Sequence, residues 1–194
     1  MNAVLVSSER HRTRDALSEA WYVFSEHLGL TPRRRHCRIP GLGIIEIDRN
    51  VLEVMKEIRQ FIMNNHPSFL ACLTFTPLHK LFRLPQQQKN GLEETEKPTD
   101  QISVIISSLK NFLHLIEEKE SWRVTVRKRY STLRSQEIIS QVVESLDIPG
   151  PVNLTDPEKI IRVEIFGSDC GVSIHGPKDV ISLPKLGRDG SQRI

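Results

Sequence analysis

Basic side chains gather at the junction between an expected strand and an expected helix, where they could hold phosphate groups. The stretch from Trp122 to Leu146, WRVTVRKRYSTLRSQEIISQVVESL, has no acidic residue before Glu137. Its candidate phosphate ligands are Arg127, Lys128, Arg129 and Arg134. The first N–H groups of a helix lack intrahelical partners and lie at the positive end of the helix dipole. With these basic side chains around them, the N–H groups would form a cradle for a phosphate.

A strand and an amphipathic helix must position this cradle. Apolar and polar residues alternate from residue 122 to residue 127, which predicts a strand with one apolar and one basic face. Ser131 or Thr132 is expected to cap the helix that follows. The apolar residues of this helix recur at helical spacing, at Ile138, Ile139, Val142, Val143 and Leu146. Tyr130, beside the turn, is the candidate for stacking on a base, whereas Trp122 shares the phase of the apolar face and is expected in the core.

A second basic run extends the candidate surface. It consists of Arg33, Arg34, Arg35, His36 and Arg38, in a loop that enters an expected strand. A solvated loop explains such a run as well as RNA contact does, and both interpretations stay open. Weaker candidates for the same track are Lys159, Arg162, Lys178 and Lys185. Phosphate contacts of this kind position a nucleic acid without reading its sequence, and they weaken steeply with salt.

The sequence offers no constellation for catalysis, a cofactor or a metal. It has no P-loop, G-x-S-x-G or H-E-x-x-H motif, and the glycines at 41 and 43 are expected to form a turn. The seven histidines never pair at metal-ligand spacing. Cys37, Cys72 and Cys170 are far apart and odd in number, so each is expected to be a small buried hydrophobe. We therefore expect no catalytic residue, no cofactor and no metal ion.

Composition indicates an ordinary soluble protein of one medium domain or two small ones. The chain has 194 residues, of which 38% are hydrophobic and 26% charged. Its net charge of +3 is only mildly basic, so the clustering of charge carries more weight than the total. No apolar run approaches the ~20 residues that cross a bilayer, and the N-terminal segment lacks the order of a signal peptide. A cytoplasmic location without membrane contact is the expectation.

Periodicity predicts an α+β fold. In the first half, strands are expected at 3–7, 35–39, 43–48 and 71–84, with helices at 13–28 and 50–66. The resulting order, β-α-β-β-α-β, is typical of a ferredoxin-like domain with two helices on one face of an antiparallel sheet. Pro77 is expected to break or bulge the last of these strands.

The second half is expected to form a separate α/β domain. A helix at 102–118 precedes the strand and helix described above, and further strands are expected at 159–166, 170–175 and 180–183. Residues 86–100 lack hydrophobic periodicity and are predicted to be a polar linker or a mobile loop. The predicted organisation is a ferredoxin-like domain at 1–85, the linker, an α/β domain at 101–186, and a flexible tail at 187–194.

The second half resembles the THUMP domain family. The resemblance rests on the strand that ends in a basic run (WRVTVRKRY), the helix opened by STLRSQEI, and the stretch VNLTDPEKIIRVEIFGSDCGVSI. The family pattern has an L-x-x-P stretch followed by two strands, matched here by residues 154–157 and 160–174. The similarity covers roughly Ile102 to Lys185. The first half resembles the N-terminal domain that accompanies THUMP in many members, and the polar segment at 86–98 departs from the family.

This resemblance implies binding of RNA, chiefly tRNA. Most THUMP proteins append a catalytic domain such as a methyltransferase, a thiouridine synthetase or a deaminase. With the sequence ending at Ile194, no such domain is expected here. The chain resembles the non-catalytic adaptors that present tRNA to an N4-acetylcytidine acetyltransferase for modification of the D-arm. Alternatives are an RNA-binding subunit for a thiolating or methylating enzyme, an enzyme with an unnoticed active site, and a ferredoxin-like interaction module without RNA.

Overall fold

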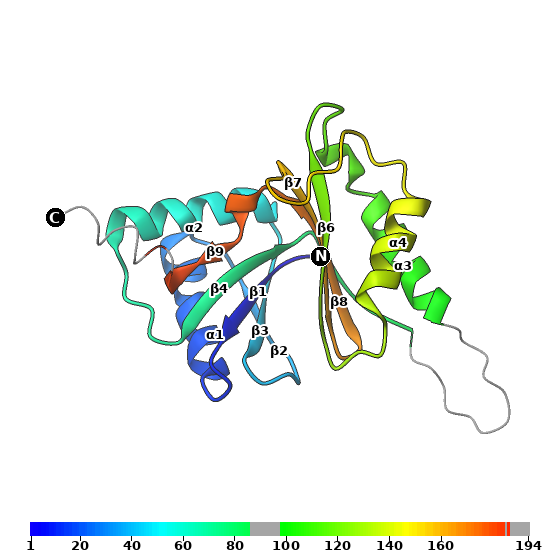
Figure 1. Ribbon diagram of the computed structural model, residues 1–194. Coiled ribbons are helices and arrows are strands. Elements are labelled where there is room, and N and C mark those ends of the chain that lie inside the picture. The colour runs from blue at the N-terminus through cyan, green and yellow to red at the C-terminus, as the bar shows by residue number, and fades with distance from the viewer. Residues whose placement is uncertain (86–97, 185, 187–194) are drawn as a thin grey trace, which may run out of the picture. The chain divides into compact units, whose positions relative to one another are not determined.

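The computed structural model describes residues 1–85, 98–184 and 186, which form two units (Figure 1). The first unit comprises residues 1–79 and the described residues from Lys178 onward, and the second comprises Lys80–Pro177. Each unit has its own sheet and its own hydrophobic core. The mixture of helices and strands confirms the predicted α+β class. Among the described residues, no helix is both long and apolar enough to cross a bilayer.

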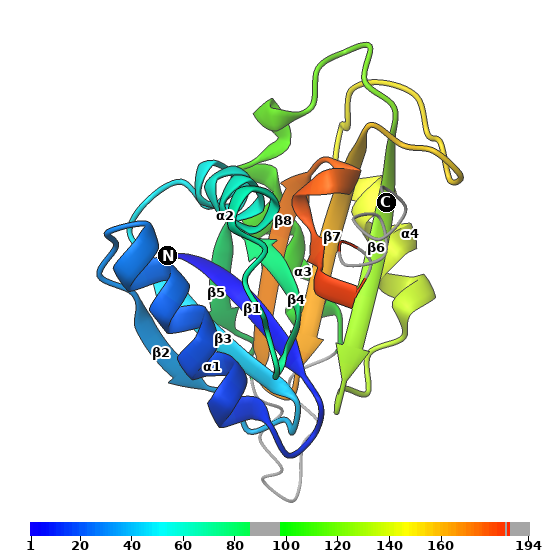
Figure 2. The same ribbon diagram turned by 90° about the vertical axis from the view of Figure 1, so that its left-hand side faces the viewer.

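The first unit has the predicted ferredoxin-like topology. Its elements are β1 (Asn2–Ser8), α1 (Thr13–Tyr22), a π-helical turn (Val23–His27), β2 (Arg33–His36), β3 (Leu42–Ile47), α2 (Val51–Asn65), β4 (Cys72–Leu78) and β9 (Ile181–Ser182). The sheet order is β2-β3-β1-β4-β9, with every neighbouring pair antiparallel. Apolar residues of β1, β3 and β4 share one core with those of α1 and α2, so both helices cover the same face (Figure 2).

Local sequence explains where α2 begins and ends. Asn50 is the N-cap, and its side-chain oxygen accepts hydrogen bonds from the backbone N–H groups of Leu52 and Glu53 at 2.9 and 3.3 Å. The helix ends at His66, which adopts a left-handed conformation with φ of 45° and donates its N–H to Ile62. The Asn50 cap and the left-handed residue His66 therefore set the bounds of this helix, close to the predicted range of 50–66.

The second unit is a four-stranded sheet with helices on one face (Figure 1). Its elements are β5 (Lys80–Arg83), α3 (Pro98–Lys110), a 3₁₀ turn (Leu113–Leu115), β6 (Trp122–Arg129), α4 (Ser135–Ser145), β7 (Lys159–Phe166) and β8 (Asp169–His175). The order is β5-β8-β7-β6, in which β6 runs parallel to β7 and the other neighbours are antiparallel. α3 and α4 share their core with the buried residues of β7 and β8.

Two short segments lie on the other side of the predicted domain boundaries. The single strand expected at 71–84 is two strands, and the later one, Lys80–Arg83, pairs with β8 in the second sheet. Ile181–Ser182, expected in the second domain, pairs with β4 in the first sheet. These pairings join residues distant in sequence, which periodicity does not reveal. Of the predicted linker, residues 98–100 are the first turn of α3, and 86–97 lie outside the described residues, as do the residues of the predicted tail.

The expected break at Pro77 is absent. β4 pairs with β1 through Pro77 to Leu78, and the register shift in this pair lies at Ser7 and Ser8 instead. In the described part of the chain, the pairing of β4 with β9 is limited to Thr74 and Phe75. At Pro77 the strand is therefore locally an edge on that side, where proline is tolerated because no ladder N–H is needed.

Removal of the α2 cap should destabilise the first unit. We expect Asn50→Ala to lower the free energy of unfolding by about 1 kcal/mol, because two backbone N–H groups lose their acceptor. Asn50→Asp, which keeps an acceptor oxygen, is the control and should stay near the parent value. Urea unfolding followed by circular dichroism measures both, and an unchanged midpoint for Asn50→Ala would contradict the assignment of this cap.

Candidate nucleic-acid interface

The strand β6 presents its basic residues as the sequence predicts. Trp122 is buried, and Val124 and Val126 pack partly buried against the core of the second unit, so one face of the strand is apolar. The Trp122 ring N–H donates to the Gly150 carbonyl at 3.0 Å, which anchors the start of the strand. Because side chains alternate along a strand, Arg127 and Lys128 project to opposite faces, and both are exposed at its carboxyl end. They flank the strand end from either side.

Arg129 differs from these two residues because it has a carboxylate partner. One of its guanidinium nitrogens, Nη1, lies 3.7 Å from Oε2 of Glu164 on β7. The other carboxylate oxygen of Glu164, Oε1, accepts a hydrogen bond from Arg162 at 2.7 Å. Glu164 is buried, so its charge is held by these two guanidinium groups. Part of the positive charge predicted for the cradle is thus compensated within the sheet.

Arg162 is a component of this buried ion-pair network. Only 8% of it is exposed, and its Nε donates to Nε2 of His175 at 3.2 Å. A guanidinium in this position stabilises the buried Glu164 carboxylate and is poorly placed for a phosphate. The prediction that Arg162 adds to the RNA track therefore has no support in its surroundings. Sequence alone could not reveal this, because the network joins β7 to β6 and β8.

The loop between β6 and α4 departs from the predicted capping. α4 begins at Ser135 with Arg134 as N-cap, so the expected cap at Ser131 or Thr132 is wrong. The Ser131 hydroxyl instead accepts the N–H of Leu133 at 3.3 Å, and the Leu133 side chain is buried. After this turn the backbone at Arg134 is extended, with ψ of 128°, so the helix begins only at Ser135.

As a result, the N-terminus of α4 carries no side-chain cap. Arg134 makes no side-chain cap hydrogen bond, in contrast to Asn50 at the start of α2. The first N–H groups of α4 are therefore available to an acceptor, and the exposed Arg134 stands beside them. Glu137 in the first turn is the one acidic residue of that turn and partly offsets this positive potential.

Tyr130 occupies a strained backbone position at the centre of the loop. Its φ is 54°, a left-handed conformation that residues other than glycine and asparagine rarely adopt. The residue is 78% exposed, so the ring is not held by core packing. An exposed aromatic ring on a strained backbone is a feature that recurs at binding sites, where it offers a stacking surface.

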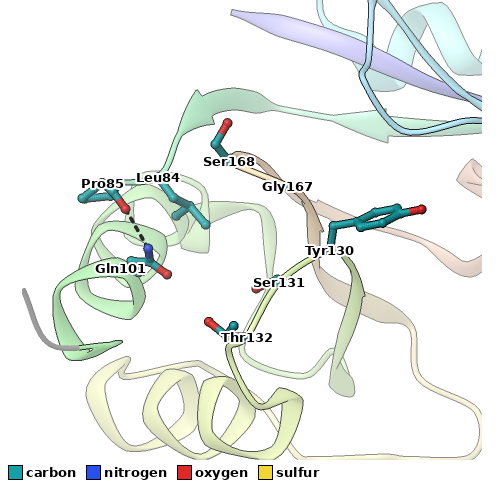
Figure 3. A pocket seen from close by; sticks show the side chains of 8 residues that line it. All are labelled: Leu84, Pro85, Gln101, Tyr130, Ser131, Thr132, Gly167 and Ser168. Atoms are coloured by element: carbon teal, nitrogen blue, oxygen red, sulfur yellow. Dashed lines mark hydrogen bonds between the residues drawn. The ribbon is translucent and has the colours of Figure 1, made fainter. Parts of the chain in front are cut away.

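An open hollow of about 320 Å³ lies beside this loop (Figure 3). It is lined by Leu84, Pro85, Gln101, Tyr130, Ser131, Thr132, Gly167 and Ser168. Backbone hydrogen bonds hold the segments together: Gly167 donates to Arg129 at 2.9 Å and Leu84 donates to Ser168 at 2.8 Å. The Gln101 side-chain amide donates to the Pro85 carbonyl at 2.6 Å. The lining is rich in hydroxyl and amide groups, which suit a polar ligand such as a nucleotide.

The loop after β6 is predictable from the sequence, but the other residues that line the hollow are not. Gln101 comes from the first turn of α3, and Gly167 and Ser168 come from the β7–β8 turn. The turn residues were recognisable as a glycine-containing turn. Their position beside Tyr130 depends on the parallel pairing of β6 with β7, which places the ends of both strands at one edge of the sheet.

The second basic run lies in the first unit, mostly on its edge strand β2. Arg34 lies over the Trp21 ring, 5.4 Å from its centroid, and its Nη1 donates to the Ser18 hydroxyl at 3.4 Å. Arg35 lies 3.7 Å from the Glu46 carboxylate. Arg33 and Arg38 are exposed. The strand predicted at 35–39 lies at Arg33–His36 instead. That this basic run binds RNA together with the basic residues of β6 stays a prediction.

Of the remaining basic candidates, Lys159 belongs to the same sheet as β6 but does not lie at the carboxyl end of that strand. Lys159 lies at the opposite end of the strands, in register with Trp122, and its Nζ is 3.3 Å from the Glu120 carboxylate. Lys178 is exposed in the first unit, where its carbonyl accepts a hydrogen bond from Arg59. Lys185 lies outside the described residues. Arg127, Lys128 and Arg134, with Tyr130, therefore form what we call the basic strand end.

Two of the three cysteines are buried and poorly suited to nucleophilic chemistry, whereas Cys37 is only partly buried, which differs from the prediction. Cys72 and Cys170 are buried as predicted, and burial raises the pKa of both thiols far above the usual range. The Cys72 thiol donates to the Ala16 carbonyl at 3.0 Å. Within the described parts of the chain, no group of three or more His, Cys, Asp or Glu side chains could hold a metal ion.

Comparison with known families identifies a domain in the second unit. The model of the THUMP domain matches residues 110–175, a range that contains β6, α4, β7 and β8. A THUMP domain is therefore present, and its matched range lies within residues 102–185, where the sequence resembles this family. Comparison with curated protein sequences gives no significant match.

Solved structures of low sequence identity share the fold. PH1313 from Pyrococcus horikoshii Ot3 superposes with a TM-score of 0.58 at 15% identity, covering 94% of this chain and 55% of that chain. TrmN from Thermus thermophilus superposes with a TM-score of 0.53 at 14% identity, covering 90% of this chain and 45% of that chain. This chain thus spans about half the length of the solved chains that it matches.

The strain at Tyr130 can be tested separately from its ring. We expect Tyr130→Gly to raise the free energy of unfolding by up to about 1 kcal/mol, because glycine adopts a positive φ without steric cost. Tyr130→Ala removes the same ring but keeps the strain, so it should give no such gain. Urea unfolding of the two variants makes the comparison. Equal stabilities would show that the backbone at this position is not strained.

Proposed function

We propose that this chain is a non-catalytic tRNA-binding adaptor that presents tRNA to a separate modification enzyme in the cytoplasm. The observation that carries the proposal is the coincidence of the THUMP domain match with the basic strand end. The matched range, 110–175, contains Arg127, Lys128, Tyr130 and Arg134. The modification is N4-acetylation of a cytidine in the D-arm, as the resemblance to free-standing THUMP adaptors implies.

The basic strand end supplies groups that complement a nucleic-acid backbone. Arg127 and Lys128 are exposed at the end of β6, and the uncapped N-terminus of α4 adds backbone donors beside Arg134. These groups bind phosphates without regard to base identity. Tyr130 adds a ring on which an unpaired base can stack, and the hollow beside it supplies hydroxyl and amide groups.

The non-catalytic part of the proposal rests on the chemistry of the described side chains. The buried thiols of Cys72 and Cys170 have raised pKa values, which keeps them protonated at neutral pH. The buried Glu164 carboxylate is engaged by two arginines, so it is not placed as a general base. Delivery of tRNA to another enzyme is consistent with a surface that binds phosphates and whose described neighbours include no activated nucleophile or general base.

Loss of a phosphate ligand should weaken tRNA binding and its dependence on salt. We expect Arg127→Ala and Lys128→Ala each to lower affinity for unmodified tRNA and to reduce the salt slope by about 1. Arg129→Ala should have a smaller effect, because Glu164 already compensates the charge of Arg129. Filter binding at several salt concentrations measures both quantities.

Lys119→Ala is the matched control for these variants. Lys119 is exposed in the same unit, before the amino end of β6, and its loss removes the same charge. Its affinity and salt slope should stay near the parent values. If Lys119→Ala weakens binding as much as Lys128→Ala does, net charge explains the binding and the assignment of the basic strand end fails.

The adaptor role predicts that modification requires a second protein. Unmodified tRNA incubated with the purified chain and acetyl-CoA should yield no N4-acetylcytidine, whereas addition of a tRNA cytidine acetyltransferase should yield it. Digestion and chromatography of the nucleosides measures the product. Acetylated or methylated nucleoside formed by the chain alone, with acetyl-CoA or S-adenosylmethionine, would show that it is an enzyme.

A further inference from the structure

Within the described parts of the chain, the outer edge of β6 is unpaired along most of its length. In the sheet order β5-β8-β7-β6, β6 is the last strand and has a partner, β7, on one side only (Figure 2). The other side carries one isolated bridge, between Trp122 and Val152. An edge of this kind presents backbone donors and acceptors in the pattern that an additional strand requires.

The hydrogen bonds at the two ends of β6 show which backbone groups face outward. Trp122 donates its N–H to Pro151 and accepts from Asn153, both at 2.9 Å, so its backbone groups face the outer edge. The carbonyls of Ser121 and Arg129 accept instead from residues at either end of β7. Because this direction alternates along a strand, the N–H and C=O groups of Val124, Val126 and Lys128 face outward. No described residue forms a backbone hydrogen bond with them across that edge.

The chain cannot close this edge with the segment that starts to pair there. After Val152, the side-chain oxygen of Asn153 accepts the N–H groups of Thr155 and Asp156 at 3.1 and 3.0 Å. This turn ends the extended conformation, and the Leu154 carbonyl accepts a hydrogen bond from the Arg123 side chain at 3.0 Å. Among residues 1–85, 98–184 and 186, the edge is therefore blocked at Trp122 and unpaired from Val124 to Lys128.

The basic side chains of β6 indicate the charge of a segment that could pair with this edge. The side chains that flank it include Arg123, Arg127, Lys128 and Arg129, and the strand has no acidic residue. A second copy of β6 would bring like charges opposite one another, which opposes pairing, whereas carboxylates would be attracted. The alternation of N–H and C=O groups suits a peptide backbone, which alternates in the same way. An RNA backbone offers mainly hydrogen-bond acceptors, which cannot bond to the outward carbonyl oxygens because these are acceptors too.

We propose that the open edge of β6, from Val124 to Lys128, binds an extended acidic segment of a partner protein as an additional strand. Backbone hydrogen bonds supply the affinity, and carboxylates beside Arg127 and Lys128 supply the selectivity. The exposed side chains of Val152 and Leu154 lie at the blocked end and offer apolar contact there. We assign this segment to the modification enzyme, and this assignment alone rests on the proposed function.

A proline substitution at Val126 tests the contribution of backbone hydrogen bonds to peptide binding separately from that of side chains. The N–H of Val126 faces the outer edge, so Val126→Pro removes an outward donor and blocks strand addition while sparing the ladder to β7. Val126→Ala keeps that N–H and loses similar packing, so it is the matched control. The probes are the labelled peptides TEVEVET and TKVKVKT, with binding to the full chain measured by fluorescence anisotropy.

We expect the glutamate peptide to bind the parent chain and Val126→Ala, with affinity for Val126→Pro at least about tenfold weaker. The lysine peptide should not bind. Equal affinity of Val126→Pro and Val126→Ala would overturn the proposal, as would the absence of binding to the glutamate peptide or equal binding of both peptides. Filter binding of tRNA to the same variants is read separately, so a failure of RNA binding does not affect this result.

Amide hydrogen exchange of the free chain gives an independent measurement. The amides of Val124, Val126 and Lys128 should exchange faster than those of Thr125 and Arg127, which face β7, and the glutamate peptide should slow the first set. Uniform slow exchange without peptide would show that the edge is already covered. Protection of the same amides by tRNA alone would assign the edge to RNA. Either result would overturn the proposal.

Discussion

The parallel pairing of β6 with β7 is the constraint on which the candidate site depends. It runs in register from Trp122 opposite Lys159 to Arg129 opposite Phe166, so both strands end at the same edge of the sheet. The hydrogen bond from Gly167 to the Arg129 carbonyl ties the β7–β8 turn to the start of the loop that contains Tyr130. Parallel strands need a long crossover, and here that crossover is α4 with its flanking loops. The hollow and the basic strand end both follow from this arrangement.

The pairing also divides the basic residues of β6 into two groups. Arg129 belongs to the ion-pair network around the buried Glu164. Arg127 and Lys128 keep their exposure at the strand end. A buried carboxylate such as Glu164 requires compensation, because desolvation of an unpaired charge is costly. The number of arginines in the sequence therefore overstates the charge available to a ligand.

The loop after β6 departs from the locally preferred conformation in two places. Tyr130 has a positive φ, and α4 starts without a side-chain cap although Ser131 and Thr132 are close by. Between these two places the side chain of Leu133 is buried, and its N–H donates to the Ser131 hydroxyl. Such departures concentrate where a protein binds ligands. The outer edge of β6 leads directly into this loop, so its unpaired backbone groups lie beside the residues proposed to bind RNA.

Periodicity and local chemistry determined most elements of this protein. The stripe of α2, its cap at Asn50 and the two faces of β6 follow from residue types within one or two turns, because each depends on neighbours in the sequence. The THUMP resemblance likewise came from local patterns, and it marked the right region of the chain. Tertiary structure alone decided that residues 80–83 join the second sheet, that Arg162 is buried against Glu164, and that Gln101 and Ser168 line a hollow beside Tyr130. These outcomes depend on strand pairing between segments far apart in the chain. The local sequence around a residue does not determine which distant segment it will pair with.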